Sequence, residues 1–581
     1  MNHIDDKYLK RKELFEFNNV GRRIFVMTVF FAASLALIGR AVYWQYDPRL
    51  EPENENNARY LRTVEIPAYH GSITDRHGTL LAVSAPLYSA WIDPLGFDDK
   101  HIATIAEAAD IKADELRVKI AAAEDKRFLY IKRHIKPQVA ERLRALKIEG
   151  LYLDQVYKRF YPAGEITAHV VGLTDVDGRG IEGIEMNTDE HLRANAGSKQ
   201  IMLDANKRTI RTIKLLKAPR NGETLALSID QRIQYHAYRA LRKAIAKHKA
   251  ESGSVVVVNA QTGEIIVAVN YPSFNPNDRR YNFADRHRNR LVTDTFELGS
   301  TIKPIIMAVA IDGGYLQKDT VIDTAPGHYQ ISSGKQIKDI HNYGKLDITG
   351  IITKSSNVGI SKIAQTVPRE TLWTYLSGIG FGQTPGTVFP GEVVGELRYH
   401  TRWSPTDHAV ISYGYGVSVS LLQLAMAYTT FANDGWRPNP SFIKDNPYFR
   451  KQQVFGAETA RAVRKMLQSA MSKDGTGNLA KVKGFTAAGK TGTTRKLVDD
   501  KGDDNEYTAV FAGFAPVQQP NFVCVVVIDK PNGDDYYGGL VAAPVFSEVM
   551  SATLRFMNFN YDEPPVFDIS NALPLVKHLH Q

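Results

Sequence analysis

The stretch "FELGSTIKPI", residues 296–305, places a hydroxyl residue and a lysine at the opening of an otherwise apolar helix. Ser300 and Lys303 are three residues apart, so in the first turn of a helix their side chains share one face. The apolar run that follows, residues 305–311, predicts that the surroundings of this pair are buried. Burial lowers the pKa of a lysine, and a neutral Lys303 can accept the proton of Ser300. The spacing therefore predicts a nucleophile and its base in one turn.

A lone S-x-x-K pattern is weak support for this interpretation, because short motifs recur by accident. A second copy, Ser332 and Lys335, lies beside a glycine in the polar stretch "ISSGKQIKD", with no apolar helix to organise it. We interpret that copy as solvated, and it serves as an internal control.

Two later motifs strengthen the first. "KSSNVGISKIA" offers Ser355 and Asn357, a hydroxyl and a carboxamide that can face one cleft. "TAAGKTGTTR" contains Lys490-Thr491-Gly492, in which a cation and hydroxyls can bind a carboxylate. Gly492 has no side chain, and we expect this to let an acyl donor lie against the strand edge. The order S-x-x-K, S-x-N, K-T-G is that of penicillin-binding proteins and class A β-lactamases.

Composition restricts the alternatives. The chain has 581 residues, 43% hydrophobic and 23% charged, which is typical of globular proteins and long enough for several domains. The net charge of +9 is modest, and no basic block is interleaved with aromatics, so a nucleic-acid partner is unsupported. The single cysteine, Cys524, lies in the apolar stretch "NFVCVVVID" and is expected to be a packed thiol. The 16 histidines show no metal-ligand spacing, and we expect no metal and no organic cofactor.

One segment has the composition of a membrane span. Residues 24–44 are almost uncharged and supply the roughly 20 residues that a bilayer core requires. Lysines and arginines precede the segment, and aromatic residues end it, which favours a cytoplasmic N-terminus. A cleaved signal peptide is the competing interpretation, but no small-x-small cleavage site follows.

We expect five parts along the chain. Their boundaries are a cytoplasmic arm at 1–22, a transmembrane anchor at 23–46, a non-catalytic α+β pedestal or dimerisation-type domain at 60–225, a catalytic domain at 226–558 and a tail at 559–581. In the catalytic domain, β-branched runs at each end predict strands that meet in one antiparallel sheet. An amphipathic helix precedes the first pair of strands, with Ile229, Ile233, Tyr235, Ala240 and Ile245 near its apolar stripe.

The whole set of motifs resembles the class B penicillin-binding proteins, from the anchor to about residue 558. Besides the three motifs, "HGSITDRHGTLLAVS", "RFYPAG", "GIEGIEM", "PSFNPN" and "FPGE" resemble family segments in the family's order. "SYGYGVS", residues 412–418, is similar to the division-specific branch, the FtsI or penicillin-binding protein 3 type. The chain departs from the family's pattern in several places: Leu298 replaces a usual proline, His70 and His77 replace a usual arginine and asparagine, and "SVSLLQLA" lacks a common Thr-Pro.

The resemblance implies a multidomain α/β protein whose catalytic domain is an antiparallel five-stranded sheet with helices on both sides. It implies a peptidoglycan D,D-transpeptidase that cross-links stem peptides through a serine acyl-enzyme, releases D-Ala and is a target of β-lactams. The implied location is the bacterial inner membrane, with a single span and a periplasmic catalytic domain at the division septum. The implied partners are D-Ala–D-Ala stem peptides, an FtsW-type glycosyltransferase and other divisome proteins.

The resemblance also implies residue roles. Ser300 is the nucleophile, Lys303 the general base, and Ser355 relays a proton to the departing D-Ala. Asn357 holds the amide of the donor. The remaining implied roles fall to the third motif, where Lys490, Thr491 and Thr493 bind the terminal carboxylate and the N–H groups of Ser300 and Thr493 form the oxyanion hole.

Three other functions are compatible with parts of the sequence. A membrane-anchored β-lactamase shares the motif order, but it requires no upstream module. Ser356 occupies the middle position of the second motif, where the pattern of those enzymes, S-D-N, has aspartate. A β-lactam sensor requires a cytoplasmic signalling domain, for which the short N-terminal arm leaves no room. A scaffold with a vestigial site is disfavoured by the intact motifs. An elongation-type class B protein is the alternative within the family.

The acidic loop 497–506 is either a gate or simply solvated, and we favour the second interpretation.

Overall fold

The structure is a computed structural model of the chain, and it describes residues 5–46, 61–203, 209–278, 284–317, 319–331, 334–387, 389–496 and 506–563. It divides into two compact units. The first consists of residues 1–67 and 196–220, and the second of residues 68–195 and 221–581. Each unit is described by itself.

The first unit contains a long helix and a small sheet. Helix α1, Asp5–Tyr46, includes the segment Val20–Tyr46, which is long and apolar enough to cross a membrane. Its apolar side chains are exposed, as expected of a lipid-facing helix rather than a core helix. The predicted N-terminal apolar helix is therefore confirmed. The three strands are antiparallel in the order β1-β8-β9, with bounds β1 Leu61–Ile66, β8 Gly197–Leu203 and β9 Thr209–Lys217.

The upstream part of the second unit is an α+β module. Its sheet has the order β10-β2-β3-β4, with β5 also paired to β3. The strands are β2 Ile73–Thr74, β3 Leu80–Ile92, β4 Leu129–Ile135, β5 Leu151–Phe160 and β10 Leu225–Ala226. Three short helices, α2 Ile102–Ala108, α3 Ala113–Ala121 and α4 Pro137–Ala145, form a core with the far end of β3. These are the small elements that glycine-punctuated segments predict.

The C-terminal domain is built on a five-stranded antiparallel sheet in the order β12-β11-β23-β22-β21. Its strands are β11 Ser252–Asn259, β12 Ile265–Tyr271, β21 Ala488–Arg495, β22 Tyr507–Ala515 and β23 Phe522–Asp529. The four valines 255–258 of β11 are fully buried and alternate between two hydrophobic clusters, one on each face. A strand buried on both faces reads as a continuous apolar run, which is what the sequence contains. Cys524 packs in this sheet as a buried free thiol.

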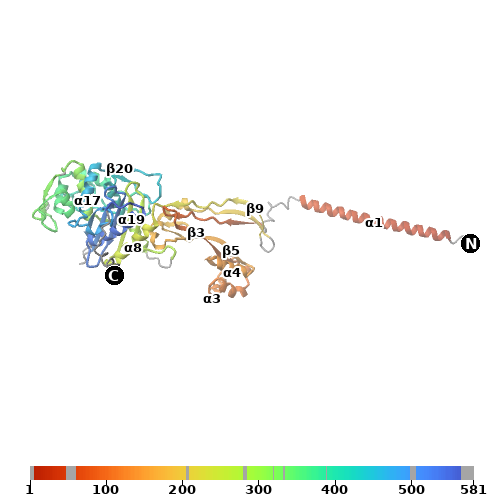
Figure 1. Cartoon of the computed structure of the whole chain (residues 1–581). Helices are drawn as coiled ribbons and strands as arrows, with labels where there is room; N and C mark the ends of the chain where they lie inside the picture. The colour runs from red at the N-terminus through yellow and green to blue at the C-terminus, as the bar shows by residue number, and fades with distance from the viewer. Residues whose placement is uncertain are drawn as a thin grey trace, which may run out of the picture. The chain divides into compact units, whose positions relative to one another are not determined.

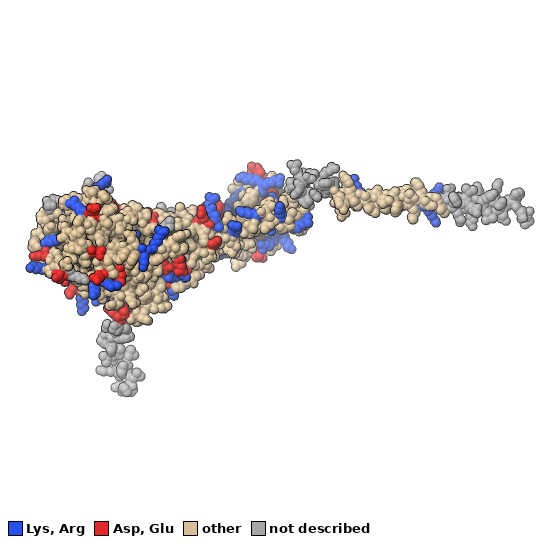
Figure 2. All heavy atoms as spheres, turned by 90° about the horizontal axis from the view of Figure 1, so that it is seen from above, with Lys and Arg blue, Asp and Glu red and all other residues tan. Residues whose placement is uncertain are grey.

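Helices cover both faces of this sheet, as predicted. On one face lie α8 Gln231–His248 and α19 Ala543–Phe556, side by side (Figure 1). On the other face lies α16 Leu421–Ala432, which packs against β11, β22 and β23. The stripe predicted for α8 is wrong at Tyr235, which is 44% exposed, because the buried face runs instead through Ile233, Ala237 and Leu241. Figure 2 shows acidic and basic side chains interspersed on the visible face of this domain.

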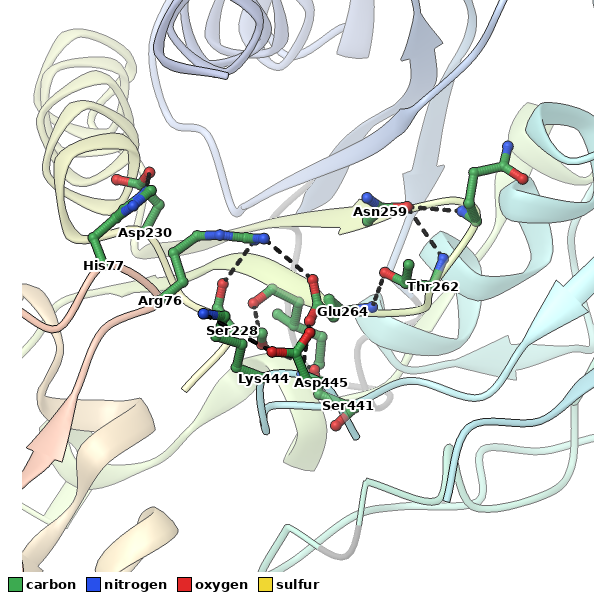
Figure 3. Close-up of polar contacts among 12 residues, drawn as sticks. Arg76, His77, Ser228, Asp230, Asn259, Thr262, Glu264, Ser441, Lys444 and Asp445 are labelled. Atoms are coloured by element: carbon green, nitrogen blue, oxygen red, sulfur yellow. Dashed lines mark hydrogen bonds and ion pairs between the residues drawn. The ribbon is translucent and has the colours of Figure 1, made fainter. Parts of the chain in front are cut away.

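A turn of the upstream module is joined to the sheet by polar contacts (Figure 3). The guanidinium of Arg76 donates to the Ser228 carbonyl at 3.3 Å and to Glu264 Oε2 at 3.3 Å. His77 Nε2 lies 3.0 Å from Oδ2 of Asp230, the N-cap of α8. His77, one of the departures from the family's pattern, therefore contacts the start of α8. These contacts attach the β2–β3 turn to the start of α8 and of β12.

Candidate active site

The candidate nucleophile lies in a tight turn. Residues Gly299–Ile302 form a 3-10 turn, and helix α11, Lys303–Asp312, follows it directly with Pro304 in its first turn. Gly299 has φ +51°, and a Cβ there would lie 2.8 Å from Thr494 Cγ2, so the turn requires glycine. Its N–H donates to the Gly414 carbonyl at 3.1 Å. The turn that carries Ser300 therefore packs closely against strand β21.

Ser355 is the centre of the site. Its hydroxyl donates to Ser300 Oγ at 3.0 Å and accepts from Lys303 Nζ at 3.1 Å and from Lys490 Nζ at 3.0 Å. Ser355 ends helix α12, Ile348–Lys354, in the left-handed region at φ +59°, which is uncommon for a residue other than glycine. The three sequence motifs thus meet at one oxygen atom.

The sequence predicts a direct pair between Ser300 and Lys303, and the structure shows a different connection. In the described part of the chain, no hydrogen bond joins Ser300 Oγ to Lys303 Nζ, and Ser355 Oγ lies between them. Because a hydroxyl both donates and accepts, the chain from Ser300 through Ser355 to either lysine can carry a proton. The arrangement supports proton transfer through Ser355.

Both lysines are fully buried. Burial, reinforced by the neighbouring Lys490 cation and opposed by Asp339, holds the pKa of Lys303 well below its ordinary value. Burial lowers the pKa of Lys490 to about 7. Lys303 also donates to the Ser355 carbonyl at 2.6 Å and to Asn357 Oδ1 at 2.7 Å. An amine with a depressed pKa can take a proton from a serine near neutral pH.

Asp339 organises the second motif, a role that the sequence motifs do not predict. Its carboxylate accepts from Ser356 Oγ at 2.6 Å and from the N–H groups of Asn357 and Val358 at 2.5 and 3.0 Å. These bonds anchor the start of helix α13, Asn357–Thr366, where unpaired N–H groups favour a negative charge. Asp339 lies 18 residues before Asn357 and belongs to no motif, so a single sequence does not indicate that it bonds to the second motif.

The third motif lies on β21, one of the two edge strands of the sheet. Thr491 Oγ1 donates to Thr476 Oγ1 at 2.8 Å, and Thr493 Oγ1 accepts from the Gly538 N–H at 3.0 Å. The structure shows a packing reason for Gly492 in addition to the predicted role toward an acyl donor. A Cβ at Gly492 would lie 2.9 Å from the Leu298 carbonyl and 3.0 Å from Thr301 Cγ2, so the glycine lets the nucleophile turn pack on the strand.

A cavity of about 310 Å³ adjoins the end of this strand. It opens between β13, Phe296–Glu297, and the residues that follow Thr493. Its polar lining combines carboxylate, guanidinium, ammonium and hydroxyl groups: Glu297, Ser418, Thr494, Arg495, Lys496 and Thr508. Burial raises the pKa of Glu297 from its ordinary value.

The control motif is not part of the site. Lys335 is exposed between β15, His328–Gln330, and β16, Gln336–Lys338, while Ser332 lies outside the described residues. Most of the acidic loop 497–506 also lies outside them. Within the described ranges, no cluster of three His, Cys, Asp or Glu side chains could hold a metal ion.

Comparisons with known proteins identify the family of this chain. Residues 253–551 match the family described as penicillin binding protein transpeptidase domain, and residues 65–227 match the penicillin-binding protein dimerisation domain. The chain is 39% identical to the probable peptidoglycan D,D-transpeptidase PbpC of Pseudomonas aeruginosa, over 92% of this chain and 95% of that protein. It is 38% identical to the peptidoglycan D,D-transpeptidase FtsI of Escherichia coli, over 90% of each chain. The solved transpeptidase domain of Burkholderia pseudomallei penicillin-binding protein 3 is 40% identical, with a TM-score of 0.54, and aligns over 58% of this chain and 98% of that one.

Proposed function

We propose, from the premise that this chain belongs to the class B penicillin-binding proteins and is a peptidoglycan D,D-transpeptidase, that Ser300 is its acylated residue and that it cross-links the septal cell wall. One observation carries the assignment of the nucleophile. Ser300, Lys303 and Lys490 all contact the hydroxyl of Ser355, within 3.1 Å.

The reaction follows from these contacts. Ser300 Oγ attacks the carbonyl between the two terminal D-Ala residues of a donor stem, and its proton passes to Lys303, directly or through Ser355. The C–N bond breaks, D-Ala departs as an amine after protonation through Ser355, and an ester to Ser300 remains. An amine of a neighbouring stem then attacks the ester, forms the new amide and returns the proton to Ser300. N–H groups of Ser300 and Thr493 stabilise each oxyanion, at about 3 kcal/mol per donor.

The third motif binds the donor in this scheme. Lys490, Thr491 and Thr493 hold the terminal carboxylate, and Asn357 contacts the donor amide. Penicillins present a carboxylate and a strained amide in a similar arrangement, so they acylate Ser300 and leave a long-lived ester.

Locating a penicillin adduct tests the assignment. Mass spectrometry of the digested, penicillin-treated protein should place the adduct on the peptide that contains Ser300. Ser300→Ala should abolish labelling by a fluorescent penicillin, whereas Ser332→Ala, in the control motif, should label as the wild type does. Equal labelling of both variants would contradict the proposal, and rapid steady-state hydrolysis of nitrocefin would instead indicate a β-lactamase.

The septal role is supported by "SYGYGVS", residues 412–418, and by the likeness to FtsI. In this proposal α1 anchors the enzyme in the inner membrane with its N-terminus in the cytoplasm and the catalytic domain in the periplasm. The anchor and the module at residues 60–225 dock an FtsW-type glycosyltransferase and other divisome proteins. Depletion in the host should give filaments with blocked septa; rounded cells would indicate the elongation-type alternative. Exchange of the anchor for an unrelated span should impair septation, and normal division would count against docking through the anchor.

A further inference from the structure

A tyrosine of the sheet-covering helix reaches the nucleophile turn. Tyr428 of α16 is fully buried, and its hydroxyl donates to the carbonyl oxygen of Thr301 at 2.8 Å. Thr301 directly follows Ser300 in the 3-10 turn. Burial raises the pKa of Tyr428 far above its ordinary value, so the hydroxyl keeps its proton and remains a donor.

Packing alone does not require this hydroxyl. A phenylalanine fills nearly the same volume, and a buried hydroxyl destabilises the fold unless it is hydrogen-bonded. The neighbouring hydroxyls of Thr429 and Thr430 bond to carbonyls of their own helix, three residues back. The Tyr428 hydroxyl instead crosses to a different element, 127 residues earlier in the chain.

Hydrogen bonds within the turn and from other elements together hold it. The Lys303 N–H donates to the Ser300 carbonyl, and the N–H and hydroxyl of Thr301 donate to the Leu298 carbonyl at 3.3 and 2.6 Å. The 3-10 geometry gives poorer internal hydrogen bonds than an α-helix, and Pro304 has no N–H to donate back to the turn. Two bonds to other elements add to these, from the Gly299 N–H to the Gly414 carbonyl and from the Tyr428 hydroxyl to the Thr301 carbonyl.

Helix α16 is a rigid support for that bond. Ser420 and Gln423 form a capping box at its start, and all twelve residues of the helix are buried. The helix packs on strands β11, β22 and β23 of the central sheet. Through Tyr428, the buried helix α16 therefore fixes the position of the Thr301 carbonyl relative to the core of the domain.

We propose that Tyr428 is a positioning residue, whose hydroxyl holds the Thr301 carbonyl and so keeps Ser300 aligned with Ser355 and the edge of β21. This inference rests on the proposed role of Ser300 as the nucleophile. Tyr428 touches no substrate, so its loss affects the chemical step and not the first encounter with a β-lactam.

The test is Tyr428→Phe in the full-length protein, with acylation by a fluorescent penicillin followed by stopped flow. The first-order acylation constant should fall about tenfold, while the dissociation constant of the initial complex stays within about twofold. Tyr161→Phe is the matched control: Tyr161 is 2% exposed, and its hydroxyl accepts from the Thr174 N–H at 3.0 Å in the upstream module. This control should lose a similar amount of thermal stability and keep the wild-type acylation constant.

Three results overturn the inference: an unchanged acylation constant in Tyr428→Phe, a change in the initial dissociation constant alone, or equal slowing in both variants. Failure of the wild type to be acylated at Ser300 would refute the proposed function instead. Should Tyr428→Phe fold poorly, 3-fluorotyrosine at position 428 gives an independent readout. Its fluorine resonance should shift on acylation more than that of 3-fluorotyrosine at position 161, and an unmoved resonance would also overturn the inference.

Discussion

Replacing Asp339 by asparagine tests how the active site is assembled. The side chain keeps its shape, and one oxygen can still accept from the Asn357 and Val358 N–H groups. The other oxygen becomes an NH₂ group facing the hydroxyl of Ser356, which now donates to it at 2.6 Å. The substitution therefore weakens two charge-assisted bonds and removes a third.

The size of the effect follows from these bonds. A hydrogen bond to a charged group contributes about 1.5–3 kcal/mol and a neutral one about 0.5–1.5 kcal/mol, so the native start of α13 loses roughly 2–4 kcal/mol. Because packing still holds the second motif in place, we expect only about 1–2 kcal/mol of this lost stabilisation to appear as an increase in the free-energy barrier to acylation. That corresponds to a decrease of about 5- to 30-fold in the acylation constant.

The charge of Asp339 gives the experiment a second readout. Asp339 raises the pKa of Lys303 against the larger effect of burial. Without that charge the pKa of Lys303 falls further, so the lysine becomes neutral at a lower pH. The rising limb of the acylation rate against pH should therefore move to lower pH in Asp339→Asn.

Stopped-flow acylation between about pH 5 and 9, with a fluorescent penicillin, measures both effects. A wild-type rate in Asp339→Asn would refute the argument that its carboxylate holds the second motif in place. A slower rate with an unmoved limb would retain the structural role and refute the electrostatic one.

Gly492→Ala should destabilise the protein by about 1–3 kcal/mol and slow acylation, because its Cβ would meet atoms of the nucleophile turn at 2.9 and 3.0 Å. Gly378→Ala, with no atom within 4 Å, is the control in thermal unfolding, and equal losses would contradict the packing argument. The pKa of Lys490 falls from 10.5 to about 7 on folding, so between these pH values the amine is protonated in the unfolded chain and mostly neutral in the folded one. The free energy of unfolding should therefore rise with pH across that window. Denaturant titrations of Lys490→Met should lack this rise, and a rise as steep as in the wild type would refute it. Arg76→Met should cost about 1–3 kcal/mol, since it breaks a mostly buried ion pair, whereas Arg142→Met, in an exposed pair, should cost less than about 1 kcal/mol in the same titrations.

Much of the catalytic domain was predictable because its signals are local. The β-branched runs of β11 and β23 are buried strands, and the apolar residues after Lys303 form the buried helix α11. The order of the three motifs, their likeness to a known family and the N-terminal apolar helix also follow from short stretches of sequence. Each strand, helix and motif among these features is itself a short, continuous stretch of sequence.

The errors and omissions share a different property. The sequence predicts a direct contact between Ser300 and Lys303 from helical spacing, but the bridging hydroxyl of Ser355 comes from 52 residues beyond the lysine. The motif that contains Gly492 also gives no indication that a Cβ there would meet Leu298 and Thr301 of the nucleophile segment. Asp339 and Tyr428 belong to no motif, and each bonds to an element other than its own, 18 and 127 residues away in sequence.

The sequence by itself determined the secondary structure, the burial of the lysine and the class of chemistry, because hydrophobic periodicity and motif spacing act over a few turns of chain. Only the tertiary structure decided which atom links the motifs, which carboxylate holds the second motif and what the glycine of the third motif accommodates. Those contacts form when long loops close around the sheet, and the geometry of that closure is set by packing of the whole domain rather than by any local pattern.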